Sequence, residues 1–379
     1  MAEPFKNQIN AALLRTMASH LARVWPAFPE ARFLTACLEG LDALELKERV
    51  THVRAALEAC LPNEFPTAVA ILERSLAPAP EGEDLGGLRT GPEGLAGWPV
   101  WPMTDYVAVR GTGHPVRALA ALREMTQRFS SEFAIRSFLD RDPEGTLRVV
   151  KTWVHDSSPH VRRLASEGTR PRLPWGLRLQ RFVADPSPCL PILEALYRDP
   201  SEYVRRSVAN HLNDISKDHP DLAVEIAGRW LKSGDAATRK LVSHALRGLV
   251  KAGFPPALTL LGFNGHHGIE ASGFKLTPKT VALGRSVAFS CRLRNTATRR
   301  VRLAVDYRVH HVKADGRLTP KVFKGSVRSM EPGETIEVAF THSLKRVTTR
   351  RYHAGRHRLE LLVNGRMVAG ADFRLTLPA

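Results

Sequence analysis

The fold of this 379-residue chain is indicated by the phrase VRRLAS at residues 161–166, which recurs twice in variant form. VRRSVA occupies residues 204–209 and TRKLVS occupies residues 238–243, so the phrases start 43 (204 − 161) and 34 (238 − 204) residues apart. Such self-similarity is typical of helical repeats, which must stack on one another to bury their apolar faces. The spacing therefore predicts an α-helical solenoid of HEAT type.

Helix-start signals support this prediction. Asp142, Ser158 and Asp199 each precede a proline, which is the usual arrangement at the first turn of a helix. Residues 5–76 also show apolar side chains at helical spacing, and we interpret them as scaffold. Residues 77–100 are rich in proline and glycine, which predicts a long surface loop.

A polar stripe lies opposite the apolar stripe in three of the predicted helices. In the helix from about Ser201 the polar stripe contains Arg206, Asn210, Asp214 and Lys217. In the last repeat it contains Lys240, Ser243, Arg247 and Lys251, and in the helix from about Ser131 it contains Glu132, Arg136 and Asp140. Stacking would join these stripes into one basic surface interrupted by a few carboxylates. For any single residue, a solvated helix face is the alternative interpretation.

From about Gly273 the period of apolar residues changes from helical to two. Val301, Leu303, Val305, Tyr307 and Val309 alternate with other residues, and turn signals stand at residues 315–316, 332–333 and 364–365. Several such strands in about a hundred residues predict an immunoglobulin-like β-sandwich. We therefore expect a helical repeat domain over residues 1–265 and a basic β-sandwich over residues 266–379.

The net charge of +17 is concentrated in the predicted sandwich. Residues 270–379 contain 22 Lys and Arg against 8 Asp and Glu, a balance of 22 − 8 = +14, which leaves +3 for residues 1–269. A local excess of this size favours a polyanionic partner, first nucleic acid and second an anionic membrane surface. The basic stretch 344–356 is a candidate contact to phosphates, with a solvated loop as the alternative.

Other classes of protein are less compatible with the sequence. The four cysteines, Cys37, Cys60, Cys189 and Cys291, lie far apart and form no C-x-x-C pair, so buried thiols are expected rather than a metal site or disulfides. We expect no metal and no cofactor, because no phosphate-cradling glycine loop is present either. No apolar run reaches the length of a membrane span and no signal-peptide pattern is found, so the cytosol of the producing cell is expected. We also expect a monomer.

Three segments carry a resemblance to a known family: SEFAIR at 131–136, RPRLPW at 170–175 and NHLNDISK at 210–217. With the paired helices, they resemble the bacterial alkylpurine DNA glycosylases of the AlkC/AlkD type, and the added β-sandwich resembles the AlkC branch. The resemblance implies a monofunctional enzyme of base excision repair. Its substrates would be cationic methylated bases in duplex DNA, such as 3-methyladenine and 3-methylcytosine, attacked without a deep base-flipping pocket.

The resemblance also implies roles for individual residues. Glu132 and Asp214 would be the catalytic carboxylates and Trp175 would contact the lesion. A base alkylated on a ring nitrogen is already a good leaving group, so a carboxylate need only stabilise the oxocarbenium-like sugar and orient water. Without the resemblance, Glu132 is a helix-start acid, Asp214 a partner of Lys217 and Trp175 a core plug.

Contacts to DNA would come from cationic and amide side chains of both domains. The candidates are Arg136, Arg163, Arg170, Arg172, Arg206, Asn210, Lys217, Lys240, Arg247, Lys345, Arg346, Arg350 and Arg351. Two other functions fit the same charge pattern: a non-catalytic lesion-binding module that recruits repair factors, and a HEAT scaffold for an acidic protein. No lysine has a context that marks it as a Schiff-base nucleophile, so lyase chemistry is not expected.

Overall fold

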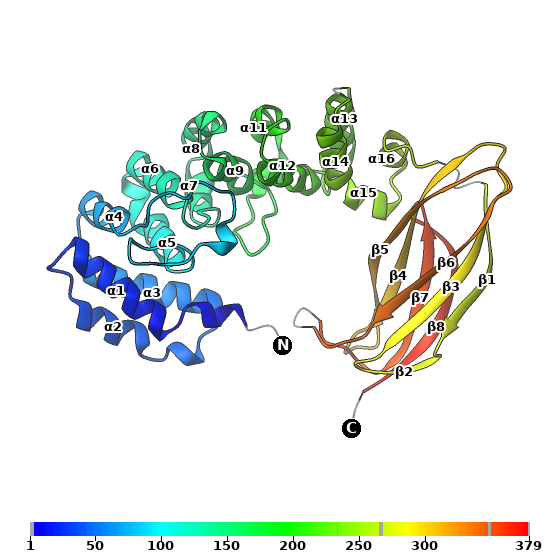
Figure 1. Ribbon diagram of the computed structural model, residues 1–379, viewed down its shortest axis with the longest axis horizontal. Coiled ribbons are helices and arrows are strands. Elements are labelled where there is room, and N and C mark those ends of the chain that lie inside the picture. Colours follow the sequence, from blue (N-terminus) through cyan, green and yellow to red (C-terminus); the bar gives the residue numbers. More distant parts are fainter. Residues whose placement is uncertain (1–3, 233, 265–267, 348–349, 378–379) are drawn as a thin grey trace. The chain divides into compact units, whose positions relative to one another are not determined.

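The computed structural model describes residues 4–232, 234–264, 268–347 and 350–377, in which helices come first and strands follow (Figure 1). This order confirms the predicted fold class, a helical repeat region followed by an immunoglobulin-like β-sandwich. The described residues within 1–218 and 234–245 form one compact unit, and those within 219–233 and 246–379 form the other. None of the described helices is long and apolar enough to cross a bilayer.

The first unit is built from helices stacked in sequence order. They are α1 (Ala11–Val24), α2 (Glu30–Leu38), α3 (Leu46–Cys60), α4 (Phe65–Arg74), α5 (Val100–Arg110), α6 (Pro115–Met125), α7 (Ile135–Arg141), α8 (Pro143–Val150), α9 (Pro159–Gly168), α10 (Gln180–Ala184), α11 (Leu190–Leu196), α12 (Glu202–Ile215) and α14 (Ala236–Ala245). Between α4 and α5 the chain forms the predicted long loop, interrupted by the 3-10 turn η3 (Leu85–Gly87).

The three repeated phrases lie in α9, α12 and α14, and α12 packs against both of the others. The second residue of the phrase has a structural role in two repeats. Arg162 Nε donates to Asp199 Oδ2 at 2.7 Å, across to the next repeat, and Arg205 caps the carbonyl of Pro200 at 2.8 Å. We expected Asp199 to cap α12, but it does not. Ser201 does so, accepting from the backbone N–H of Val204, because the helix begins two residues later.

The second unit combines three helices with the strands. The helices are α13 (Pro220–Leu231), α15 (Arg247–Ala252) and α16 (Pro255–Leu260). The strands are β1 (Ile269–Thr277), β2 (Thr280–Ala282), β3 (Ser286–Asn295), β4 (Val301–Val312), β5 (Leu318–Met330), β6 (Thr335–Ser343), β7 (Gly355–Val363) and β8 (Arg366–Thr376). Contacts between Leu258, Phe263 and Ala304 join α16 to β4. The domain boundary at residues 265 and 266 stays a proposal.

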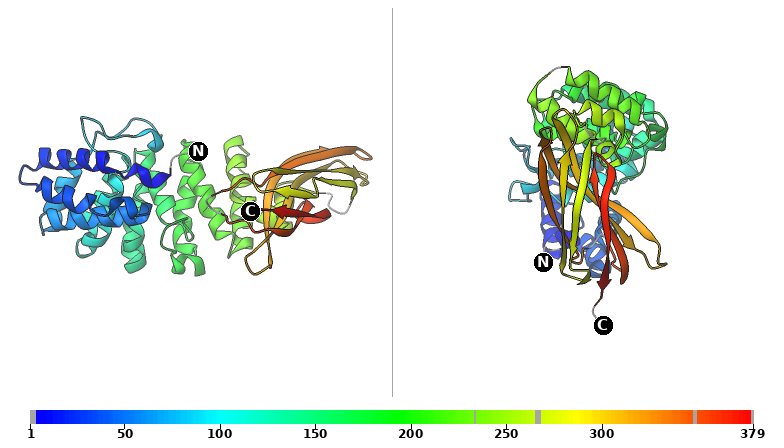
Figure 2. Two further views of the ribbon diagram at one scale, coloured as in Figure 1. Left: turned by 90° about the horizontal axis from the view of Figure 1, so that it is seen from below. Right: turned by 90° about the vertical axis from the view of Figure 1, so that its right-hand side faces the viewer.

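The strands form two sheets, in the orders β1-β3-β6 and β2-β8-β7-β4-β5, and the strand axes are roughly aligned in Figure 2. Neighbouring strands are antiparallel except for β2 and β8. Their buried side chains form one core between the sheets, as the period-two pattern predicts. The predicted turn at residues 364–365 connects β7 to β8, and Asn364 and Gly365 have φ values of 48° and 77°. Two positive φ angles are what a type I′ hairpin requires. The four cysteines are buried free thiols, as expected.

Three buried histidines predict that the sandwich loses stability in acid. Burial lowers the pKa of His311 to about 3 and of His342 to about 4, and it also lowers the pKa of His357. Below about pH 6.5 these histidines therefore bind protons in the unfolded chain but not in the folded sandwich. The sandwich has its full stability above that pH and loses stability as the pH falls.

Urea unfolding of the full chain, followed by near-ultraviolet circular dichroism between pH 7.5 and 4.5, measures this effect. The expected result is a steady fall in the midpoint of the sandwich transition below pH 6.5. Replacing His342 with Phe should flatten the decline. A midpoint that is constant across this range would contradict the prediction.

Candidate active site

A chain of alternating charges runs through the middle of the first unit. Its members, in spatial order, are Glu132, Arg163, Glu167, Arg170, Asp214 and Lys217. The two predicted catalytic carboxylates are 82 positions apart in sequence (214 − 132). The packing of α9 against α12 brings them into one network, because Arg163 and Glu167 lie on α9 and Asp214 lies on α12.

Glu132 forms one end of this chain, in the turn just before α7. Its Oε2 accepts from Ser130 Oγ at 2.7 Å and lies 2.9 Å from the NH1 of Arg163. The Arg163 guanidinium stands 5.1 Å from the ring centroid of Tyr203. Burial alone would lower the pKa of Arg163, but Glu132 and Glu167 outweigh it and raise that pKa. The guanidinium is therefore a permanent cation beside Glu132.

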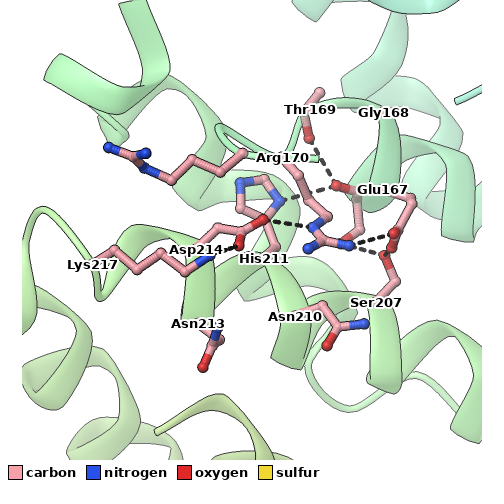
Figure 3. Close-up of polar contacts among 12 residues, drawn as sticks. Glu167, Gly168, Thr169, Arg170, Ser207, Asn210, His211, Asn213, Asp214 and Lys217 are labelled. Atoms are coloured by element: carbon pink, nitrogen blue, oxygen red, sulfur yellow. Dashed lines mark hydrogen bonds and ion pairs between the residues drawn. The ribbon is translucent and has the colours of Figure 1, made fainter. Parts of the chain in front are cut away.

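Glu167 and Asp214 share a second guanidinium (Figure 3). Arg170 donates from NH1 to Glu167 Oε1 at 2.5 Å and from Nε to Asp214 Oδ2 at 2.8 Å. Ser207 Oγ donates to the other oxygen of Glu167 at 2.6 Å. Lys217 Nζ donates to Asp214 Oδ1 at 2.8 Å, so the predicted pairing of these two residues is present together with the arginine contact.

These contacts keep the buried carboxylate of Glu167 charged. Burial would raise the pKa of Glu167, but Arg163 and Arg170 outweigh it, with help from Ser207, and the net shift is downward. His211 lies one helical turn before Asp214, and its Nδ1 is 3.0 Å from the carbonyl oxygen of Ser166. Burial and the nearby Arg170 lower the pKa of His211 to about 4, so this imidazole is neutral at pH 7.

Trp175 is not a core plug, because 61% of it is exposed. It lies on the wall of a cavity of about 560 Å³. The other lining residues are Arg172, Leu173, Pro174, Gly176, Arg178, Gln180 and Lys217. Lys217 connects this cavity to Asp214, since it lines the former and binds the latter. The site therefore joins an exposed indole, a cationic cavity and a buried carboxylate.

Two of the predicted phosphate contacts are wrong. Arg136 is fully buried, and its guanidinium donates to the carbonyls of Leu177 at 2.6 Å and Gly168 at 2.8 Å. Burial lowers the pKa of Arg136 to about 10. Arg170 is also buried and is occupied by two carboxylates. The predicted polar stripe through Glu132 and Arg136 fails for the same reason: α7 begins at Ile135, and Arg136 points into the protein.

The remaining predicted contacts differ in how free they are to meet DNA. Arg206, Lys217 and Lys240 expose more than half of their side chains, whereas Arg172 forms two hydrogen bonds with Asp218. Arg163 lies between carboxylates, and the side chains of Asn210 and Arg350 contact His244 and His311. The exposed candidates of the second unit are Lys345, Arg346 and Arg351. The stripe from Lys240 to Arg247 is not continuous, because α14 ends at Ala245.

Glu167 and Lys47 are the residues that sequence reasoning missed. Glu167 stands three positions before Arg170, a spacing at which opposite charges pair on a helix, so a signal was available. Lys47 Nζ donates to the backbone carbonyl of Trp175 from 128 positions away. Nothing in the local sequence indicates this contact. Among the described residues, no group of His, Cys, Asp and Glu side chains is arranged to hold a metal ion.

Comparison with known proteins places the whole architecture in one family. A family model described as the C-terminal Ig-like domain of uncharacterised protein YhaZ matches residues 270–377. Uncharacterized protein YhaZ of Bacillus subtilis (strain 168) is 37% identical over 371 residues, which cover 98% of this chain and 99% of that protein. A solved structure of Pseudomonas fluorescens alkylpurine DNA glycosylase AlkC, bound to DNA containing an abasic site analog, matches with a TM-score of 0.88.

That structure is 36% identical in sequence and covers 99% of this chain and 100% of its own. Helical repeats followed by an Ig-like domain thus define the class of protein. The chain belongs to the AlkC branch of the AlkC/AlkD family of HEAT-like repeat proteins.

Proposed function

We propose that this protein is a monofunctional DNA glycosylase that hydrolyses the N-glycosidic bond of cationic alkylated bases in duplex DNA. Its substrates would include 3-methyladenine and 3-methylcytosine, and its product would be an abasic site. The observation that carries the proposal is the charge chain that links the carboxylates of Glu132 and Asp214, together with the exposed indole of Trp175 in the same unit. The match to a DNA-bound AlkC structure supports the same reaction class.

The chemistry follows from the charge of the substrate. A cationic base departs without protonation, so the site needs no strong general acid. The deoxyribose then becomes oxocarbenium-like, and the carboxylate of Asp214 or Glu132 can stabilise that charge and orient the attacking water. Arg170 and Lys217 hold both oxygens of Asp214, which fixes the carboxylate in one orientation. No step in this scheme calls for a cofactor.

The cavity beside Trp175 argues against a pocket for the flipped base. Three cationic side chains, Arg172, Arg178 and Lys217, line it and no carboxylate does, although Arg172 is hydrogen-bonded to Asp218 and Lys217 to Asp214. A positively charged base would be repelled there, whereas a backbone phosphate would be attracted. We infer that the cavity takes a phosphate near the lesion while the base stays outside. This assignment favours attack without a deep base-flipping pocket.

Release of free base from methylated duplex DNA tests the proposal. The purified full chain is incubated in chelator with duplexes containing 3-methyladenine or 3-methylcytosine, and the released bases are quantified. Release of either base, with an abasic site left in the strand, is the expected result. Tight binding without release would favour the non-catalytic lesion-binding module. Equal binding to DNA and to another polyanion would favour the protein scaffold.

Trp175→Ala should weaken the handling of cationic lesions specifically. A cation near an indole face is stabilised by roughly 0.5–2 kcal/mol, which corresponds to a loss of about 2- to 30-fold in kcat/KM. Affinity for undamaged duplex should change much less, because the indole carries no charge for phosphates. Leu177→Ala is the control, because it removes another exposed apolar side chain from the same loop. Equal losses in both variants would contradict a specific role for the indole.

A further inference from the structure

The turn Leu173–Gly176 holds a tryptophan in a backbone conformation that L-residues seldom adopt. Gly176 N donates to Leu173 O at 3.2 Å, Pro174 occupies the second position, and Trp175 occupies the third with φ of 66°. A type II turn places proline and a positive φ at these same positions, and its third position favours glycine or asparagine. A tryptophan there persists only when its surroundings hold it, and such outliers are often found at functional sites.

Two side chains from other parts of the first unit hold this loop by its carbonyl groups. Arg136 on α7 donates to Leu177 O at 2.6 Å, from a fully buried position. Lys47 in the first turn of α3 donates from Nζ to Trp175 O. Lys47 is exposed, and its contact is directed at the strained residue itself.

We propose that Lys47 is a positioning residue for Trp175. Its ammonium holds the carbonyl of the strained turn, so that the indole is already oriented when the lesion arrives. This inference rests on the proposed glycosylase function for its kinetic consequence. It assigns a role in the reaction to a region that the sequence predicts only as scaffold.

A different role for the same lysine would be a direct contact to a DNA phosphate. The two roles predict different measurements. A phosphate contact weakens binding to every duplex and lowers the slope of log affinity against log salt by about one when removed. A positioning contact leaves binding to undamaged DNA unchanged and slows base release, because misplacement of a substrate-contacting group by about 1 Å can cost about 100-fold.

The test compares Lys47→Met with Arg15→Met, which removes one exposed positive charge from α1 of the same unit. Single-turnover release of 3-methyladenine and the salt dependence of binding to undamaged duplex are measured for both. Lys47→Met is expected to slow release by up to the roughly 2- to 30-fold loss expected for Trp175→Ala, with an unchanged salt slope. Lys47→Arg should restore most of the rate, and Arg15→Met should match the wild type. A lowered salt slope or an unchanged release rate in Lys47→Met would overturn the proposal.

A double-mutant cycle shows whether Lys47 acts through Trp175. If it does, the double variant Lys47→Met/Trp175→Ala releases base no more slowly than Trp175→Ala alone, because the group that Lys47 orients is already missing. Multiplied losses in the double variant would mean that the two residues act independently, which would overturn the proposed role.

Acrylamide quenching separates failure of this inference from failure of the proposed function. Trp175 is the tryptophan with a strongly exposed side chain in the described residues, and Trp175→Phe identifies its share of the emission. Lys47→Met should change the acrylamide quenching constant when Trp175 is present. The same replacement should leave the quenching constant unchanged when Trp175 has been replaced with Phe. No difference would overturn the contact even in an active enzyme. A difference in a chain that releases no base would support the contact while the glycosylase proposal fails.

Discussion

Asp214→Asn is expected to reduce base release by about a hundredfold to ten-thousandfold while binding to duplex DNA stays close to that of the wild type. The amide has nearly the same shape as the carboxylate but no negative charge to stabilise the oxocarbenium-like sugar. Asp214 is 1% exposed and holds both Arg170 and Lys217 through its two oxygens. The change therefore removes charge at a fixed point of the site.

Single-turnover release of 3-methyladenine, together with direct binding to the same duplex, measures this effect. Glu132→Gln should behave in the same way, since Glu132 is the carboxylate at the other end of the charge chain. Glu225→Gln is the matched control, because Glu225 forms an exposed ion pair with Arg229 on α13. Near-normal release by both Asp214→Asn and Glu132→Gln would exclude the carboxylates from catalysis and leave binding as the function of this surface.

Arg170→Met is expected to lower the free energy of unfolding by about 3–5 kcal/mol, the largest stability effect that we predict for a single replacement. The Arg170 guanidinium lies between Glu167 and Asp214, all three of them buried. Removing it takes away the cation that Glu167 and Asp214 share, and leaves Lys217 as a hydrogen-bonded partner of Asp214. The positive charge of Arg163 compensates only in part, because its NH2 is 3.6 Å from Glu167.

Urea unfolding followed by far-ultraviolet circular dichroism provides the measurement. Arg206→Met is the control: Arg206 stands in α12, is two-thirds exposed and pairs with Glu202 at 3.6 Å, so its loss should cost no more than about 1 kcal/mol. Combining Arg170→Met with Glu167→Gln should recover part of the loss, because one of the stranded charges is then removed. A loss in Arg170→Met as small as that of the control would show that the charge chain does not stabilise the fold.

Local patterns were sufficient for the fold class because each of them depends on neighbours in sequence. The repeated phrase identified α9, α12 and α14, whose apolar residues return at helical spacing and pack on one another. Alternation from Val301 to Val309 identified β4, since successive side chains of a strand face opposite sides of a sheet. Turn residues at 364–365 identified the β7–β8 hairpin for a similar reason.

Such local patterns did not predict which charged residues are buried. Arg136 stands at a position that the helical period assigned to a solvated stripe, yet it is fully buried because the loop carrying Trp175 folds over it. Arg170 was expected at a phosphate and instead neutralises two carboxylates. A periodicity specifies which face of a helix a residue occupies, but not what will cover that face.

The sequence by itself therefore determined the two kinds of secondary structure, the repeat register and the concentration of positive charge in residues 270–379. It also named Glu132, Trp175 and Asp214 as candidates through the family resemblance. Only the tertiary structure decided that Glu132 and Asp214 share one charge network and that Lys47 contacts Trp175. The network links residues 82 positions apart and the Lys47 contact joins residues 128 positions apart. Separations of that kind are bridged by how whole helices stack and not by any local spacing.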